Sequence, residues 1–227
     1  MPNPETYSIL AGKASRLWVF EGLACSDEGG WEGWLVDGEE RLSVSANAHG
    51  KIVGQGRNPV WRVDVGGFRG VWKTHWHGGL LGGILRARYW GVDRLESEVH
   101  LAAALRAAGV ATPRVLLALA ARSGLFWKHH IVTEEIRNSA TVFELRNRRE
   151  VLEAAHHLMR KVFNLGLWAP DLHPGNLLWV EETKQCYLLD LAGARLLNRP
   201  LTDLECAARL DRFNRFMHKY SQRHPRS

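Results

Sequence analysis

Residues 171–176, Asp-Leu-His-Pro-Gly-Asn, and residues 187–190, Tyr-Leu-Leu-Asp, are the stretches from which the fold can be worked out. The first follows residues 148–164, whose apolar side chains recur at the spacing of an amphipathic helix that stops at Gly166. It leads into two short apolar runs that are typical of a strand hairpin. The sequence therefore predicts a loop that joins a long helix to a hairpin.

The predicted hairpin pairs residues 176–180 with residues 186–190. This pairing places Asn176 and Asp190 side by side. An amide oxygen and a carboxylate are hard ligands of the kind that Mg²⁺ prefers, together with phosphate oxygens. We therefore expect Asn176 and Asp190 to share a magnesium ion, with Asp171 facing an incoming hydroxyl group and accepting or orienting its proton.

Upstream of this loop, the chain predicts three antiparallel strands near residues 51–53, 60–65 and 70–76. The turn between the first two strands is Gly54-Gln55-Gly56. Backbone N–H groups of such a turn can approach a phosphate because no Cβ atom intervenes. Taken alone, a Gly-x-Gly turn is more often an ordinary hairpin turn, so it indicates phosphate binding only together with the neighbouring motifs.

Lys73 on the third strand has a candidate partner in Glu98 on the following helix. Such a pair can hold a cation against the α- and β-phosphates of a nucleotide. Each residue also has a structural explanation, Lys73 as a solvated strand lysine and Glu98 as an exposed helix residue. The order of the features along the chain nevertheless favours phosphoryl transfer.

The remaining elements are a helix near residues 95–108, strands near 114–121 and 125–133, and a C-terminal helix near 201–220. The order predicts an α+β fold in which a small antiparallel-sheet lobe precedes a mostly helical lobe. Residues 1–45 suggest short strands and turns around Gly29-Gly30 and Gly33, with no assigned role. The predicted organisation is an N-terminal extension at 1–45, an N-lobe at 46–136 and a C-lobe at 137–227.

Several short motifs are spread along the chain. They lie at residues 54–57 with 60–61, at 73–80 with 88–89, at Glu98 with 101–105, at 109–113, at 133–136, and at Asp171, Leu172, Asn176 and Leu178. Together these motifs resemble the lipopolysaccharide kinase family, which includes Kdo kinases and core-heptose kinases. The likeness covers about residues 49–200, and it implies a compact, bilobal, protein-kinase-like fold.

The resemblance implies ATP and Mg²⁺ as cofactors and a glycolipid or small sugar as acceptor. Residues 133–136 would be the hinge whose backbone binds adenine, through Glu134 and Ile136. The implied roles are catalysis for Asp171, ATP binding for Gly54, Gly56, Lys73, Glu98, Glu134 and Ile136, and metal binding for Asn176 and Asp190. The expected reaction is phosphorylation of a hydroxyl group of Kdo or core heptose in lipopolysaccharide.

Two departures from the family pattern keep alternatives open. Residues 168–170 are Trp-Ala-Pro where the family has a histidine, and residues 190–193 are Asp-Leu-Ala-Gly. The Asp-Leu-His-Pro-Gly-Asn loop also resembles ubiquinone-biosynthesis and small-molecule kinases. A kinase for another small molecule, an ABC1-like ATPase and a nucleotide-binding pseudokinase that acts as an interaction module therefore remain alternatives.

The formal net charge is +6, and residues 199–227 hold seven Lys and Arg against three Asp and Glu. On the C-terminal helix, Leu210, Phe213, Met217 and Tyr220 form an apolar stripe beside a basic one of Arg209, Arg212, Arg215, Lys219 and Arg223. The basic stripe suggests either a solvated face or contact with an anionic sugar-lipid headgroup or acidic bilayer. No nucleic-acid-binding motif accompanies the charge, so we expect no nucleic-acid partner. The oligomeric state stays open.

The location is expected to be cytoplasmic, with a peripheral position on the inner face of the inner membrane as its extension. No stretch has the length and apolarity of a spanning helix, and the first residues lack a secretory pattern. Cys25, Cys186 and Cys206 are too widely spaced for a metal or disulfide pattern. His75 and His77 alternate onto one strand face, but no zinc site is expected.

Overall fold

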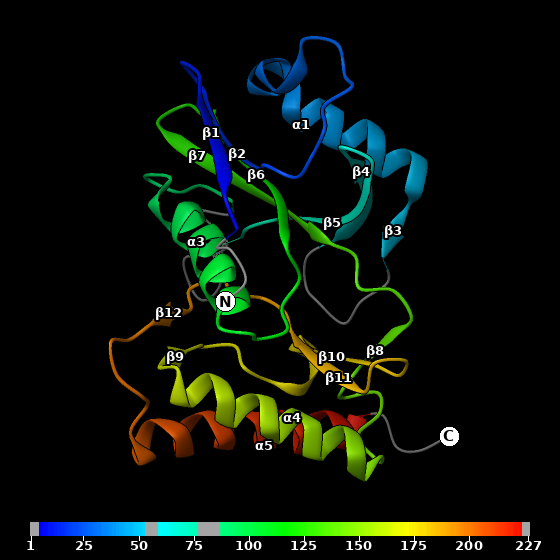
Figure 1. Cartoon of the computed structure of the whole chain (residues 1–227), viewed down its shortest axis with the longest axis vertical. Helices are drawn as coiled ribbons and strands as arrows, with labels where there is room; N and C mark the ends of the chain where they lie inside the picture. Colours follow the sequence, from blue (N-terminus) through cyan, green and yellow to red (C-terminus); the bar gives the residue numbers. More distant parts are fainter. Residues whose placement is uncertain (1–4, 53–58, 77–86, 224–227) are drawn as a thin grey trace. The chain divides into compact units, whose positions relative to one another are not determined.

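The structure is a computed structural model and describes residues 5–52, 59–76 and 87–223. The predicted turn with Gly54 and Gly56, as well as His77, lies outside the described residues. The chain forms two compact units, the first made of Met1–Ala107 with Arg114–Glu135 and the second of Ala108–Pro113 with Ile136–Ser227. Figure 1 shows the elements of each unit.

A seven-stranded antiparallel sheet forms the first unit, in the order β1-β2-β6-β7-β5-β4-β3. Its strands are β1 (Tyr7–Ala11), β2 (Ser15–Phe20), β3 (Lys51–Ile52), β4 (Val60–Val65), β5 (Phe68–Thr74), β6 (Val115–Ser123) and β7 (Phe126–Glu134). The antiparallel pairing predicted for three successive strands is confirmed, in the pairs β3–β4 and β4–β5. The strands β1 and β2, which come before the predicted N-lobe, extend the same sheet through the pairing of β2 with β6.

The turn between β4 and β5 depends on its two glycines. Gly66 and Gly67 have φ angles of 58° and 80°, and a turn with two such residues suits the twist of a hairpin. A Cβ atom on Gly66 would also lie 2.8 Å from the carbonyl oxygen of Ala24. Gly66 is therefore required by both conformation and space, and it sets the register of the strand that carries Lys73.

Residues 30–49 correct the sequence-based prediction, because they form the helix α1 (Gly30–His49), which is kinked at Asp37, rather than short strands and turns. The glycines misled the prediction, since glycine costs a helix only about 1 kcal/mol. Four buried residues at intervals of four, Trp34, Gly38, Leu42 and Ala46, offset that cost by packing. At Gly38 a Cβ atom would come within 2.9 Å of Cδ2 of Leu119, so a larger residue there would force this buried side chain to shift.

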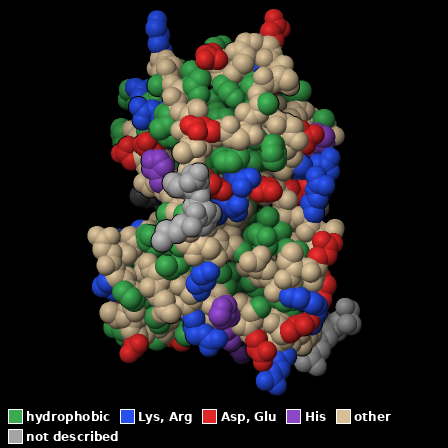
Figure 2. Space-filling view, in the orientation of Figure 1, with side chains coloured by type: hydrophobic (Ala, Val, Ile, Leu, Met, Phe, Trp, Pro, Cys, Tyr) green, Lys and Arg blue, Asp and Glu red, His purple; other side chains and the backbone are tan. Residues whose placement is uncertain are grey.

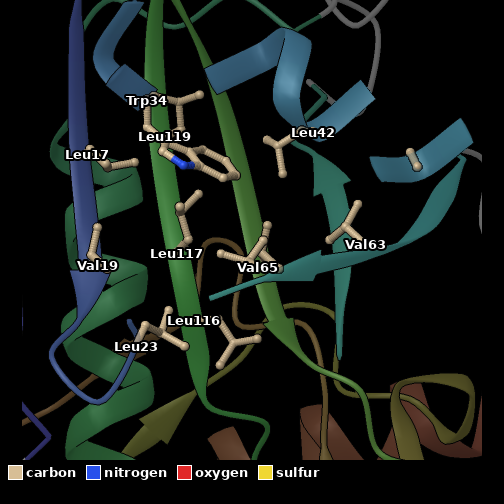
Figure 3. Packing of buried hydrophobic residues seen from close by; sticks show 12 residues of the cluster. Leu17, Val19, Leu23, Trp34, Leu42, Val63, Val65, Leu116, Leu117 and Leu119 are labelled. Atoms are coloured by element: carbon tan, nitrogen blue, oxygen red, sulfur yellow. The ribbon is translucent and has the colours of Figure 1, made fainter. Parts of the chain in front are cut away.

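The core of the first unit lies between α1 and one face of the sheet. Figure 3 shows Trp34 and Leu42 of α1 with Leu117 and Leu119 of β6, and all four are buried. Removing each such side chain from water stabilises the unit by about 1.5–3 kcal/mol. The helix α3 (Asp93–Ala107) packs against β6 and has its own buried stripe.

In its described residues, the second unit contains a three-stranded sheet, a two-stranded sheet, two α-helices and a short 3₁₀ helix. The elements are β8 (Ser139–Thr141), α4 (Arg149–Asn164), β9 (Leu167–Trp168), the short 3₁₀ helix η1 (Pro174–Asn176), β10 (Leu177–Val180), β11 (Gln185–Leu188), β12 (Arg195–Leu196) and α5 (Asp203–Arg223). The sheet orders are β11-β10-β8 and β12-β9. The predicted long helix, the hairpin and the C-terminal helix are confirmed.

Gly166 ends α4 for a physical reason that the sequence signal alone did not reveal. Its φ angle is 86°, and a Cβ atom there would lie 2.3 Å from the carbonyl oxygen of Arg199. The glycine lets the segment after α4 pass close to the segment before α5. The chain can then enter β9 and the loop that carries Asp171.

Candidate active site

The loop that carries Asp171 is held by hydrogen bonds within itself. The side-chain Nδ2 of Asn176 donates to the carbonyl oxygen of Asp171 at 3.0 Å, and the backbone N–H of Asn176 donates to the carbonyl of His173 at 2.9 Å. The backbone N–H of Gly175 donates to Nδ1 of His173 at 3.1 Å. These bonds tie the two ends of the loop together and turn Oδ1 of Asn176 away from the Asp171 carbonyl.

The hairpin after this loop brings the predicted metal ligands to one end. Leu177 on β10 pairs with Leu188 on β11, and the N–H of Leu189 donates to the carbonyl of Asn176 at 2.9 Å. Asn176, just before β10, and Asp190, just after β11, therefore lie at the same end of the hairpin.

Asp190 itself has an unusual backbone. Its φ angle is 42°, and its Oδ1 accepts a hydrogen bond from the N–H of Ala192 at 3.2 Å. The left-handed conformation is uncommon outside glycine, although aspartate tolerates it better than most residues. Such conformations occur often at functional sites, where the surrounding structure holds them.

Asp171 is exposed, with 53% of its side-chain surface accessible, and it forms an ion pair with Arg212 of α5. Arg212 is not among the residues that the sequence predicted for the site. The two residues are 41 positions apart, so no local pattern links them. The sequence feature that could have indicated Arg212 was its spacing from Arg209. The two arginines are three residues apart and flank apolar positions of one helix.

The face of α5 that packs inward differs from the predicted apolar stripe. Phe213 is buried as expected, but Leu210 is exposed, and Phe216 packs instead on the ring of His173. The basic stripe is also not uniformly solvated, because Arg209 and Arg212 contact the segment 168–171. The aromatic ring of His173 on the loop therefore determines which side of α5 packs inward.

In the first unit, Lys73 lies on β5 opposite Ile131 of β7. Its neighbours Trp72 and Thr74 point to the other face, where both contact Nδ1 of His130, at 3.3 and 3.0 Å. Since side chains alternate along a strand, Lys73 shares a face with His75.

Glu98 of α3 lies over this same face. Its Oε2 is 3.3 Å from Nε2 of His75, and both side chains are about 5% exposed. The explanation of Glu98 as an exposed helix residue is therefore wrong. The predicted pairing of Glu98 with Lys73 stays a prediction, and His75 is a partner of Glu98 that the sequence analysis missed.

His129 lies beside His75, with ring centroids 6.2 Å apart. The ring of Tyr89 stacks on it at 4.3 Å, and Nε2 donates to the carbonyl of Gly91 at 2.9 Å. Burial lowers the pKa of His129 to about 4, so the ring is neutral near pH 7. His129 therefore adds no positive charge to the face of β5 and β7 on which it lies.

The predicted hinge begins at the end of β7. The N–H of Glu134 donates to the carbonyl of Arg114 at 2.8 Å, and the N–H of Glu135 donates to the carbonyl of Arg69 at 3.1 Å. Ile136 accepts a hydrogen bond at its carbonyl from Ser139 Oγ at 2.7 Å. Binding of adenine by Glu134 and Ile136 stays a prediction.

Within the described part of the chain, no group of three or more His, Cys, Asp or Glu side chains is arranged to hold a metal ion. His75 is engaged with Glu98, as described above. The remaining candidate is the pair Asn176 and Asp190, whose amide and carboxylate oxygens need phosphate oxygens or water to complete a coordination sphere.

An antiparallel sheet with a lysine on an inner strand and a buried glutamate on the adjacent helix forms one unit. A loop with Asp171 and Asn176, followed by a hairpin that ends in Asp190, forms part of the other. These features define a protein with a kinase-like fold.

Comparison with known proteins agrees with this class. Residues 46–222 match the lipopolysaccharide kinase (Kdo/WaaP) family, so the chain belongs to that family. The solved structure of WaaP in complex with acyl carrier protein is similar with a TM-score of 0.53 and 16% sequence identity, over 88% of this chain and 80% of that one. At this identity the likeness shows the fold.

Among similar proteins are 3-deoxy-D-manno-octulosonic acid kinases. That of Vibrio vulnificus is 28% identical over 157 residues, which cover 62% of this chain and 66% of the relative. That of Photobacterium profundum is 28% identical over 155 residues, which cover 61% and 66%. The matched part thus spans just under two thirds of the length of these relatives.

Proposed function

We propose that this protein transfers the γ-phosphoryl group of ATP to a hydroxyl group of a sugar in lipopolysaccharide, Kdo or core heptose. The observation that carries the proposal is the bonded arrangement of Asp171, Asn176 and Asp190 around one loop and hairpin. Membership of the lipopolysaccharide kinase family supports the sugar acceptor.

The donor atoms at Asn176 and Asp190 fit Mg²⁺. One amide oxygen and one carboxylate are hard ligands, and Mg²⁺ commonly keeps waters or substrate phosphates at its other positions. When bound, Mg·ATP supplies the phosphoryl group and neutralises charge that develops on it. Asn176 combines two functions, because its Nδ2 fixes the Asp171 carbonyl while Oδ1 is left to face a cation.

Asp171 is the acceptor-side group in this proposal. Its carboxylate is exposed, so an incoming hydroxyl can reach it. It orients that hydroxyl and accepts its proton as the new P–O bond forms and the bond from the γ-phosphorus to the bridging oxygen of ADP, the leaving group, breaks. In the first unit, we assign Lys73 to the α- and β-phosphates and Glu98 to the placement of Lys73, with Gly54 and Gly56 approaching phosphate and Glu134 and Ile136 binding adenine.

The test is transfer of labelled phosphate from ATP by the purified full-length chain to Kdo-lipid A and to core oligosaccharide, with Mg²⁺. We expect label in the glycolipid and its loss when Mg²⁺ is chelated. Label in choline or an aminoglycoside would instead identify another small-molecule kinase. ATP hydrolysis without any acceptor would identify an ATPase, and a thermal shift with Mg·ATP without turnover would identify a pseudokinase.

The peripheral membrane position is also part of the proposal. None of the helices in the described ranges is long and apolar enough to cross a membrane. Around the turn of the β6–β7 hairpin, however, Trp90 is 76% exposed and Leu125 is 75% exposed, and the Trp90 ring packs on Phe126 at 4.7 Å. Figure 2 shows Lys and Arg side chains beside hydrophobic ones at this end of the hairpin, at the upper left.

Exposed tryptophan beside cations is typical of surfaces that bind the headgroup region of a bilayer. Arg122 lies over the Trp127 ring at 5.1 Å, and Arg94 lies over the Tyr89 ring at 5.4 Å. Each cation close to an anionic surface contributes about 1 kcal/mol to binding. We propose that this end of the hairpin rests on an anionic bilayer that holds the glycolipid acceptor.

The double variant W90A/L125S should sediment with phosphatidylglycerol-containing vesicles several-fold less than the wild type, because both apolar contacts are removed. Phosphatidylethanolamine vesicles without the anionic lipid should bind neither protein. The matched control is V36S, which changes an apolar residue that is 89% exposed on α1. Equal losses for W90A/L125S and V36S would contradict the assignment of this surface.

A further inference from the structure

The C-terminal helix α5 is packed onto the loop that carries Asp171. The ring of Phe216 stacks on His173 with centroids 4.2 Å apart and an interplanar angle of 5°, and it meets Phe143 edge-on at 5.5 Å. Phe213 of the same helix is 1% exposed. These aromatic contacts fix the helix against the loop and determine which of its side chains face Asp171.

Three guanidinium groups gather around residues 168–171. Arg209 donates from Nη1 to the carbonyl of Ala169 at 3.3 Å and lies over the Trp168 ring at 5.1 Å. Arg195 of β12 lies over the same ring at 4.7 Å, and Arg212 pairs with Asp171. The positive charge beside the loop thus exceeds the single negative charge of Asp171 that it contacts.

These arginines retain donors for a further anion. Arginine has five N–H donors, and Arg212 uses Nη2 for Asp171 while its side chain stays 43% exposed. The Nε groups of Arg209 and Arg212 are buried without a hydrogen-bond acceptor among the described residues, so the donors that a ligand can reach are those on the Nη atoms. A carboxylate or phosphate is the planar or multidentate partner that such guanidinium groups bind best.

The excess positive charge lies next to Asp171, where it can act on an acidic acceptor. An acceptor with an acidic group near its reacting hydroxyl would be repelled by the Asp171 carboxylate. A guanidinium group between the two anions reverses that repulsion and also limits the orientations of the carboxylate. Neutral acceptors gain only the second effect.

We propose that Arg212 is a positioning residue for Asp171 and that Arg212, Arg209 and Arg195 form an acceptor subsite for an acidic group of the sugar, a carboxylate or a phosphate. The inference rests on the proposed function. It assigns to α5 a role in choosing the acceptor, beyond a solvated basic face.

The experiment compares the wild type, R212Q, R212K and R209Q on Kdo-lipid A and on its Kdo methyl ester, which keeps the hydroxyl groups and removes the charge. R212Q should lower kcat on both acceptors. R212Q and R209Q should raise KM for the acid by roughly tenfold to a hundredfold, the range for a lost charge-assisted hydrogen bond, with little change for the ester. R212K should restore part of the KM effect, and the KM for ATP should stay constant.

R215Q is the matched control, because Arg215 is an exposed arginine of the same helix. If R215Q raised the KM for the acid as much as R212Q, a general basic face would explain the data and the subsite would be wrong. An unchanged ratio of acid to ester in R212Q and R209Q would overturn it equally. A phosphorylated heptose acceptor, tested in parallel, distinguishes a phosphate from a carboxylate as the group bound.

A binding measurement separates this inference from the proposed function. Isothermal titration of the same full-length proteins with free Kdo and with its methyl ester requires no turnover. If the wild type transferred no phosphate yet bound the acid through Arg212, the proposed function would fail and the subsite would stand. If the wild type bound acid and ester equally, the subsite would fail whatever the activity.

Discussion

We expect the replacement of Asp171 with asparagine to lower kcat for phosphoryl transfer by about 10² to 10⁴, the contribution of a positioned general base. The asparagine side chain has the same shape but accepts no proton at neutral pH. It also loses the charge that pairs with Arg212. KM for ATP should change little, because Asp171 faces the acceptor in the proposed mechanism. Single-turnover transfer to the glycolipid measures the effect.

The fold of this variant should be intact. Asp171 is 53% exposed, and a single exposed ion pair contributes only about 0–1 kcal/mol to stability. The melting temperature should therefore stay within a few degrees of the wild type. D211N is the control, since Asp211 is an exposed carboxylate one position from Arg212 on α5. Wild-type kcat in D171N, or a matching loss in D211N, would remove Asp171 from the catalytic role.

The substitution D190N should weaken the use of Mg²⁺ by at least about 10²-fold, since even the outer partners of a metal site are worth about 10- to 100-fold in affinity. Asparagine accepts the left-handed backbone of Asp190 as readily as aspartate does, so the loss reports on the carboxylate. The Mg²⁺ concentration at half-maximal rate should rise, and excess Mg²⁺ should restore part of the activity.

The control for this experiment is E182Q in the turn at the other end of the same hairpin. Glu182 accepts a hydrogen bond from Asn138 at 2.9 Å and has no place in the proposed metal site. It should leave the Mg²⁺ dependence unchanged. If D190N and E182Q gave the same Mg²⁺ titration as the wild type, Asp190 would not be a metal ligand.

Much of the second unit could be predicted from local sequence. The apolar spacing of α4 is a feature of a single helix, and the polar turn between β10 and β11 is a feature of a single hairpin. The hydrogen bonds from Asn176 and Leu189 follow from that local geometry. Short-range patterns sufficed because the contacts that define these elements are themselves short-range.

Residues 30–49 and α5 show where this reasoning stops. Glycines in α1 suggested turns, yet one of them, Gly38, follows the kink of a helix and leaves room for the side chain of Leu119. On α5, helical spacing allowed more than one apolar stripe, and only the rings of His173 and Phe143 selected Phe216 as an inward residue. Propensity is a weak preference that tertiary packing overrides when the two disagree.

Sequence alone determined the class of fold, the order of most of its elements and a candidate site of Asp171, Asn176 and Asp190, because these depend on neighbours along the chain. Only the tertiary structure decided that β1 and β2 extend the sheet, that Glu98 is buried against His75, and that Arg212 pairs with Asp171. Those contacts join residues far apart in sequence. Their partners are chosen by which faces meet when the helices and strands of each unit pack, and no periodicity in a single segment encodes that choice.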